Sequence, residues 1–192
     1  MNIYINATGP NSEGGYFTYI TNLVNNLAFV DTINNYRVAS NGEIYDSIKS
    51  IKGNFQIVKL SQIHRFSIVR FLWMQLFLPI ILLTNNIKIC FSPLNAVPYL
   101  LKLFKIKSVI VIHSNLPWVD SKYLPYGNFK ANIMMILKNI SLKCSDAVIT
   151  VSHFAKEELI WKANLPSEKV HTIYLGVNKS LGKTTIINEK YF

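Results

Sequence analysis

Residues 145–160 read SDAVITVSHFAKEELI, a strand pattern that runs directly into a helix pattern. The segment Ala147–Val151 is apolar except for one threonine, as is typical of a strand buried on both faces of a parallel sheet. Ser152 follows it, and a serine in this place predicts the N-cap of the next helix. A buried strand followed at once by a capped helix is the repeating unit of α/β proteins.

The same alternation extends outward along the rest of the chain. Short apolar runs separated by helical patterns predict seven strands. They indicate a Rossmann-like, doubly wound α/β fold with a mostly parallel sheet. The expected strands are Asn2–Asn6, Tyr36–Ser40, Phe55–Leu60, Ile87–Phe91, Ser108–His113, Ala147–Val151 and Val170–Leu175.

Helical patterns between these strands predict four helices. The second covers Arg65–Leu83, with a kink or break at Pro79, and the fourth begins after Ser152. The first and third each have one apolar face, formed by Tyr16, Ile20, Leu23, Val24 and Leu27 in the first and by Phe129, Ile133, Ile136, Leu137 and Ile140 in the third.

Composition excludes several classes of protein. The 192 residues are 50% hydrophobic and 16% charged, which suits one folded domain and excludes a disordered chain. Cys90 and Cys144 stand in no disulfide framework and in no metal-ligand spacing, so no metal site is expected. The uncharged segment Phe71–Leu83 is about 13 residues long, whereas a membrane span needs about 20, so it favours a buried or interfacial helix.

The net charge of the chain is +10, and the excess is concentrated in one stretch. Between Ser47 and Val119 there are nine basic residues and no acidic residue. Such a block favours an anionic partner, either a nucleic acid, an anionic membrane or a phosphorylated substrate. A lysine-rich solubilising surface explains it equally well. No nucleic-acid-binding motif accompanies the charge, so a nucleic-acid partner is not expected.

Candidate functional residues stand where the expected strands end, because ligands of doubly wound sheets bind at the carboxyl ends of the strands. His113 ends one strand, where an imidazole can bind a sugar hydroxyl, transfer a proton or position a phosphate. A histidine satisfied by loop carbonyls is the alternative. Gly14 and Gly15 precede the first helix, where they either admit a phosphate to the helix N-terminus or form an ordinary turn.

Small polar side chains stand at further strand ends. Ser92 and Asn95 follow one strand, and they either donate hydrogen bonds to a substrate or close the turn. Ser114 comes directly after His113. Ser152 either faces the same cleft or only caps its helix. The sequence contains no nucleophile elbow, zinc pattern, P-loop or dinucleotide fingerprint.

Several of these segments together resemble the N-terminal half of a GT-B glycosyltransferase of glycosyltransferase family 4. The segments are GGYFTYITNL (14–23), RFLWMQLFLP (70–79), FSPLNAVP (91–98), VIVIH (109–113), SDAVITVSHFAKEEL (145–159) and LPSEKVHTIYLGVN (165–178). The resemblance runs from about Met1 to Asn178, and the last two segments are its most specific part.

This resemblance implies a protein of two Rossmann-like domains with the active site between them. The N-terminal domain would bind the acceptor, and the C-terminal domain would hold a UDP- or GDP-sugar. The resemblance implies hexosyl transfer with retention of configuration, without a metal or other cofactor. The acceptor would be lipid-linked or a polysaccharide, in cell-surface glycan synthesis. The protein would be cytoplasmic and peripheral on the inner face of the plasma membrane.

By the same resemblance, His113 is the catalytic residue, and Gly14 and Gly15 form a glycine loop beside the donor phosphates and the acceptor. The other acceptor-binding or phosphate-binding candidates are Tyr16, Ser92, Asn95, Ser114 and Ser152. Two positions depart from the family pattern. Ser114 stands where an aspartate is common, and Met74 stands where a glutamate is common.

The length of the chain bears on whether it can transfer sugar by itself. We expect residues 1–178 to form the N-terminal domain and residues 179–192 to be a linker toward a C-terminal domain that the sequence lacks. Because catalysis needs groups from both sides of the cleft, the chain alone should be inactive and should need the other domain in cis or in trans. The alternative is a non-catalytic module that binds an acceptor or depends on a partner for its donor site.

Basic residues beside apolar segments also suit an anionic membrane surface. The candidate membrane residues are Arg65, Arg70, Lys102, Lys105 and Lys107. They flank the helix expected at Arg65–Leu83 and the segment YLLKLF (99–104). In the alternative, both segments belong to the ordinary hydrophobic core.

Overall fold

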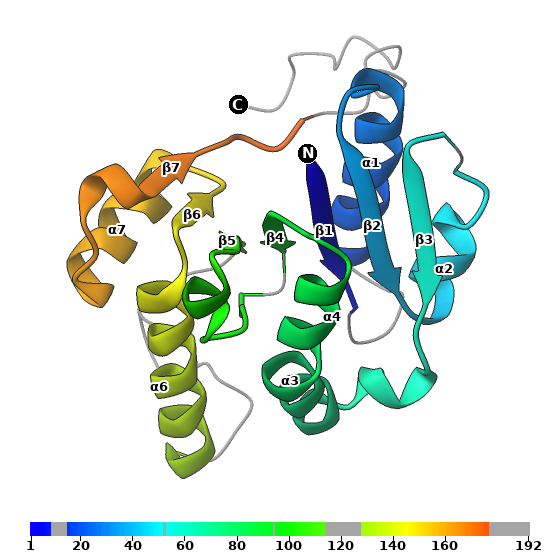
Figure 1. Cartoon of the computed structure of the whole chain (residues 1–192). Helices are drawn as coiled ribbons and strands as arrows, with labels where there is room; N and C mark the ends of the chain where they lie inside the picture. Colours follow the sequence, from blue (N-terminus) through cyan, green and yellow to red (C-terminus); the bar gives the residue numbers. More distant parts are fainter. Residues whose placement is uncertain (9–14, 52, 94, 114–127, 177–192) are drawn as a thin grey trace, which may run out of the picture.

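The computed structural model describes residues 1–8, 15–51, 53–93, 95–113 and 128–176. Their centre is a seven-stranded sheet in the order β3-β2-β1-β4-β5-β6-β7, in which every neighbouring pair is parallel (Figure 1). The strands are β1 Asn2–Ala7, β2 Asn35–Ser40, β3 Phe55–Lys59, β4 Ile89–Ser92, β5 Lys107–Ile112, β6 Ala147–Thr150 and β7 Val170–Thr172. All seven predicted strands are confirmed, with ends that shift by up to three residues.

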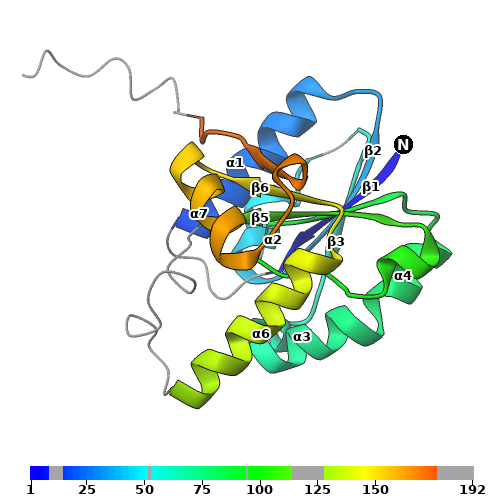
Figure 2. The same cartoon turned by 90° about the vertical axis from the view of Figure 1, so that its left-hand side faces the viewer.

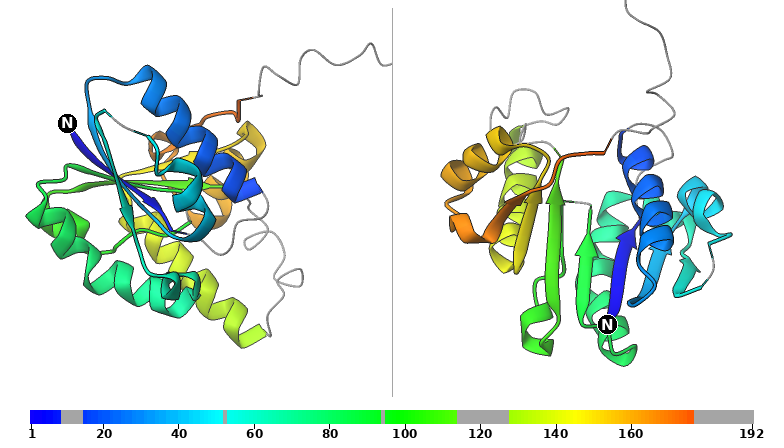
Figure 3. Two further views of the ribbon diagram at one scale, coloured as in Figure 1. Left: turned by 90° about the vertical axis from the view of Figure 1, so that its right-hand side faces the viewer. Right: turned by 90° about the horizontal axis from the view of Figure 1, so that it is seen from above.

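Helices cover both faces of this sheet. The helices are α1 Gly15–Val30, α2 Gly42–Ile48, α3 Ser67–Leu76, α4 Leu78–Thr84, α6 Asn128–Cys144 and α7 His153–Ala163, with short 3-10 turns η1 Gln62–Arg65, η2 Leu101–Phe104 and η4 Ser167–Lys169. Helices α1 and α2 lie on one face, and α3 and α4 lie on the other (Figures 2 and 3). The α/β, doubly wound class predicted from the sequence is therefore confirmed.

The core follows the alternation of side chains along the strands. Tyr4 of β1 points toward α3 and α4 and packs with Leu78 and Leu82. The next residue, Ile5, points to the opposite face and packs with Ile20 and Val24 of α1. At the other end of the sheet, α6 and α7 complete a third apolar cluster through Leu142, Leu159 and their neighbours on β5, β6 and β7.

The helix expected at Arg65–Leu83 is divided in two, as Pro79 predicts. Pro79 lies in the first turn of α4, where its missing N–H costs least, and the chain bends at Phe77 between the two helices. No helix in the described part of the chain is long and apolar enough to cross a membrane.

Two helix predictions need correction. Helix α2 was not predicted, although Ile44 and Ile48 are spaced as one buried helical face. The apolar face predicted for the third helix is wrong at Ile133 and Ile136, which are exposed in α6. Figure 1 gives the reason, because the N-terminal half of α6 reaches well past the carboxyl end of the sheet and has no strand to cover.

The strand order creates a switch point between β1 and β4. From β1 the chain continues to β2 and β3 on one side, and from β4 it continues to β5, β6 and β7 on the other. Ligands of doubly wound sheets bind at such a point, outside the carboxyl ends of the strands. This places the expected site where β1, β4 and β5 end.

Candidate active site at the carboxyl edge of the sheet

His113 lies at this edge, directly after the last residue of β5. Two tyrosine rings of α1 contact its imidazole edge-on, with ring centroids 4.5 Å away for Tyr19 and 6.5 Å away for Tyr16. Tyr16 also donates a hydrogen bond of 3.3 Å to the carbonyl of Thr8, at the end of β1. The first turns of α1 therefore link the carboxyl ends of β1 and β5.

The imidazole of His113 is held in its neutral form. Burial lowers its pKa below the usual 6.5, and a hydrogen bond to the Pro93 carbonyl opposes this shift without cancelling it. Nε2 is buried and has no hydrogen-bond partner among the described residues, so the bond to Pro93 belongs to the other nitrogen. A proton on Nδ1 leaves a lone pair on Nε2, which can accept a hydrogen bond or a proton.

The end of β4 contributes a tight polar turn. Ser92 is buried and donates its hydroxyl hydrogen to the carbonyl of Ala96, so it closes the turn. Asn95 adopts a left-handed backbone conformation, with φ at 57°, and its buried Oδ1 has no partner in the described part of the chain. We considered two roles for this pair, hydrogen bonding to a substrate and closing the turn. In the structure Ser92 closes the turn, and the Asn95 oxygen can still accept a hydrogen bond.

Contacts between buried side chains hold the carboxyl end of β1 in place. Asn6 is fully buried, and its Oδ1 accepts a hydrogen bond of 2.7 Å from the Thr8 hydroxyl. Its amide lies 3.9 Å from the sulfur of Met74 on α3. Met74 therefore packs beneath the site and adds no charge to it.

Arg70 of α3 also belongs to this region, although it was predicted as a membrane residue. Its side chain is half-buried, and burial lowers its pKa while the nearby Tyr16 opposes the shift. Burial likewise raises the pKa of Tyr16 well above the usual range, so Tyr16 stays neutral. A guanidinium beside the open end of the sheet suits a phosphate or another anion.

Gln75 of α3 fixes the segment that follows Asn95. Its amide donates to the Val97 carbonyl at 3.2 Å, and its oxygen accepts from the Tyr99 backbone N–H at 2.9 Å. Both bonds tie the turn after β4 to the helix that carries Arg70. Helix α3 is therefore part of the framework of the site.

The other predicted residues have different positions. Gly14 and Ser114 lie outside the described residues, and Gly15 begins α1 at the surface. Ser152 caps α7, with its Oγ accepting from the Ala155 N–H at 3.1 Å. Lys107 forms an ion pair with Asp146 at 3.1 Å, at the amino end of β5.

The remaining membrane candidates are only partly described. Lys102 and Lys105 are exposed at η2, whereas the side chain of Arg65 lies outside the description. Sequence reasoning missed Tyr19, Gln75 and the place of Arg70 in the site. The three-residue spacing of Tyr16 and Tyr19, which places both on one side of a helix, was the signal available for Tyr19.

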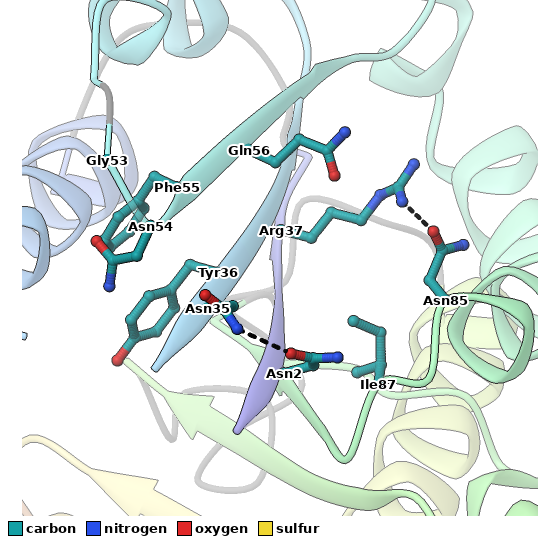
Figure 4. Close-up of a pocket in the computed structure, with 10 residues that line it drawn as sticks. All are labelled: Asn2, Asn35, Tyr36, Arg37, Gly53, Asn54, Phe55, Gln56, Asn85 and Ile87. Carbon is teal, nitrogen blue, oxygen red and sulfur yellow. Dashed lines mark hydrogen bonds between the residues drawn. The ribbon is translucent and has the colours of Figure 1, made fainter. Parts of the chain in front are cut away.

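A hollow of about 300 Å³ lies at the opposite, amino edge of the sheet (Figure 4). Some of its polar side chains bind one another: the Asn35 amide donates to Asn2 at 3.2 Å, and the Arg37 guanidinium donates to Asn85. Strand geometry favours the carboxyl edge for ligands, so we place the functional site at His113 and not in this hollow. Among the described residues no group of side chains is arranged to hold a metal ion.

Solved structures share this fold. A glycosyltransferase from Rickettsia africae ESF-5 matches with a TM-score of 0.60 and 18% identity, over 95% of this chain and 46% of its own length. HepE from Anabaena, in complex with UDP and glucose, matches with a TM-score of 0.57 and 13% identity over 95% and 46%. The lipopolysaccharide outer core galactosyltransferase WaaB, in its apo form, matches with 0.56 and 12% over 92% and 46%.

These likenesses define the class of fold. The structures from Rickettsia africae and of WaaB are glycosyltransferases by their descriptions, and the chain spans about half the length of each of the three solved structures. The chain thus has the fold of the N-terminal Rossmann-like domain of a GT-B glycosyltransferase. The model of Glycosyltransferase Family 4 matches residues 45–181, and the chain belongs to that family. No curated protein matches it in sequence.

Proposed function

We propose that the chain is the acceptor-binding half of a glycosyltransferase that moves a hexose from a nucleotide-sugar to a lipid-linked or polysaccharide acceptor in cell-surface glycan synthesis. Membership of Glycosyltransferase Family 4 supports sugar transfer. The observation that carries the proposal is the neutral, buried imidazole of His113, whose Nε2 has no partner among the described residues. A nitrogen that can accept a hydrogen bond at the switch point suits a sugar hydroxyl.

Under this proposal, three of the described residues have different roles in the transfer. His113 Nε2 accepts a hydrogen bond from a hydroxyl of the transferred sugar and so orients it toward the acceptor. Asn95 offers a second buried hydrogen-bond acceptor, its Oδ1, in the turn after the neighbouring strand β4. Arg70, beside Tyr16, supplies positive charge near an anionic group of the acceptor or of the leaving nucleotide.

A second domain would complete the cleft. Under this proposal the second domain, in the same polypeptide or in a partner, holds the UDP- or GDP-sugar. The transfer proceeds with retention of configuration and without a metal or other cofactor. It takes place on the cytoplasmic side of the plasma membrane. The lengths of the solved structures support this proposal, because the chain spans 46% of two that share its fold.

The test is a transfer assay with membranes of the source cell as the acceptor and radiolabelled UDP- and GDP-hexoses as donors. The longest form of the gene product, or this chain mixed with a separate donor-binding half, should label the membranes, and the chain alone should not. Transfer by the chain alone would refute the division into halves. Absence of transfer with every donor and form would favour a non-catalytic acceptor-binding module.

A further inference from the structure

Tyr19 of α1 packs directly against the imidazole of His113. The two ring centroids lie 4.5 Å apart, and the ring planes meet at 74°, whereas the centroid of Tyr16 lies 6.5 Å away. Aromatic rings favour this edge-to-face arrangement at centroid distances of about 4.5–7 Å. The Tyr19 contact is at the short end of that range, so the phenol ring leaves the imidazole little room to rotate.

The packing of α1 holds Tyr19 in this place. The next residue, Ile20, is fully buried and belongs to the core cluster that α1 forms with β1. Three residues before Tyr19, the hydroxyl of Tyr16 donates a hydrogen bond of 3.3 Å to the Thr8 carbonyl at the end of β1. The helix is therefore attached to the sheet before and after Tyr19. The Tyr19 ring cannot leave His113 unless these contacts break.

Two contacts from different elements fix the imidazole. The Pro93 carbonyl, in the turn after β4, accepts a hydrogen bond from one ring nitrogen, and the Tyr19 ring lies against the imidazole from α1. Rotation of the imidazole would break the first contact and disturb the second. Because Nε2 is buried without a partner among the described residues, these two contacts decide the direction of its lone pair.

The ring of Tyr19, and not its hydroxyl, makes this contact. Unlike the hydroxyl of Tyr16, that of Tyr19 forms no hydrogen bond with the described residues. Burial raises the pKa of both tyrosines, so both are neutral, and the one charged group described near them is Arg70 of α3, beside Tyr16. A neutral ring that keeps water from the imidazole of His113 disfavours its charged form.

We propose that Tyr19 is a positioning residue, whose ring holds the imidazole of His113 in one orientation and shields it from water, so that Nε2 stays directed toward a sugar hydroxyl. The effect on the imidazole follows from the contact alone, whereas its consequence for transfer rests on the proposed function. The opposite effect is also physically possible, because the face of a phenol ring attracts a cation and could stabilise an imidazolium. The sign of the change in the pKa of His113 decides between the two.

The first experiment follows the titration of His113 in the 192-residue chain by NMR. The signal of its Cε1–H group is identified among those of the four histidines by its loss in His113→Gln. Tyr19→Ala admits water to the imidazole, so the pKa of His113 should rise toward 6.5. Tyr19→Phe keeps the ring and should keep the wild-type pKa. Tyr45→Ala removes a half-buried tyrosine of α2 and, as the matched control, should also leave that pKa unchanged.

Three results would overturn the proposal. They are an unchanged pKa of His113 in Tyr19→Ala, a lower pKa in that variant, and the same shift in Tyr45→Ala as in Tyr19→Ala. If circular dichroism shows that Tyr19→Ala does not fold, Tyr19→Leu replaces it with the same expectation. Leucine keeps an apolar side chain and a good helix former at this position, but it has no ring.

The second experiment measures hexose transfer by the complete transferase. Tyr19→Ala should lower kcat by about tenfold or more with a smaller change in KM, because the imidazole is less well oriented. The acidic limb of its pH–rate profile should move upward with the pKa of His113. Tyr19→Phe and Tyr45→Ala should stay within about twofold of the wild type. A role of Tyr19 in stability alone would lower the melting temperature and leave the pH–rate profile unchanged.

The two experiments fail separately. A raised pKa of His113 in Tyr19→Ala, without transfer by any form of the protein, would refute the proposed function and leave the effect of Tyr19 on the imidazole standing. Transfer at the wild-type rate by Tyr19→Ala would refute the positioning role and leave the proposed function standing.

Discussion

At the scale of single residues, His113 is buried, and its Nε2 has no hydrogen-bond partner among the residues that the structure describes. Its folded-state pKa is below 6.5, so the unfolded chain binds more protons between that lowered value and 6.5. Stability due to this group is present above pH 6.5 and is lost as the pH falls through the lowered pKa. The group therefore favours folding at neutral pH.

We expect the free energy of unfolding in urea to decrease between pH 7.5 and pH 5. His113→Gln should show a smaller decrease, because the variant has no imidazole to protonate. His171→Gln, which changes an exposed histidine of β7, should keep the wild-type dependence. The same pH dependence in His113→Gln and the wild type would mean that burial of His113 does not shift its titration.

Ser152 allows a second test at this scale. Its Oγ accepts from the Ala155 N–H and satisfies one free donor at the start of α7. Ser152→Ala should lower the free energy of unfolding by about 1 kcal/mol. Ser47→Ala, at an exposed position of α2, should change it by less than about 0.5 kcal/mol. Equal effects in urea titrations would show that Ser152 does not act as a cap in solution.

The sequence predicts some of these residues and not others, for a physical reason. His113 and Ser152 follow apolar strands directly, so their place at the carboxyl edge follows from strand direction alone. Arg70 and Gln75 enter the site through the packing of α3 against the end of β1 and the turn after β4. Nothing local in the sequence around Arg70 indicates those contacts.

At the scale of elements, α4 separates core from surface within one helical turn. Leu82 is fully buried against the sheet, and Leu83 is 51% exposed. Leu82→Ala should lower the free energy of unfolding by about 2–5 kcal/mol. Leu83→Ala should lower it by less than about 1 kcal/mol. Similar losses for the two variants in urea denaturation would contradict the orientation of α4.

The helices and strands could be predicted wherever their packing repeats apolar residues at a regular spacing along the sequence. The strands are continuous apolar runs because both faces are buried, and Pro79 marks the break between α3 and α4. Helix α2 was missed because it has only seven residues and starts at Gly42, whose φ of 55° is typical of a turn. The exposed positions Ile133 and Ile136 could not be predicted, because the length of α6 beyond the sheet depends on the whole fold.

At the scale of the whole molecule, the order of the strands decides where function lies. The order in which the chain adds strands reverses between β1 and β4, although all strands are parallel, and Tyr16 and His113 meet near that point. The sequence predicts that such an edge exists. It does not predict that α3 brings Arg70 and Gln75 to that edge.

The most direct measurement is the rate of hexose transfer by the complete transferase with His113→Gln, against His171→Gln as the control. If the site is at the carboxyl edge of β5, His113→Gln should lower kcat/KM by about 100-fold or more, and His171→Gln should leave it unchanged. A His113→Gln enzyme that transfers sugar at the wild-type rate would contradict the central claim that this imidazole takes part in transfer.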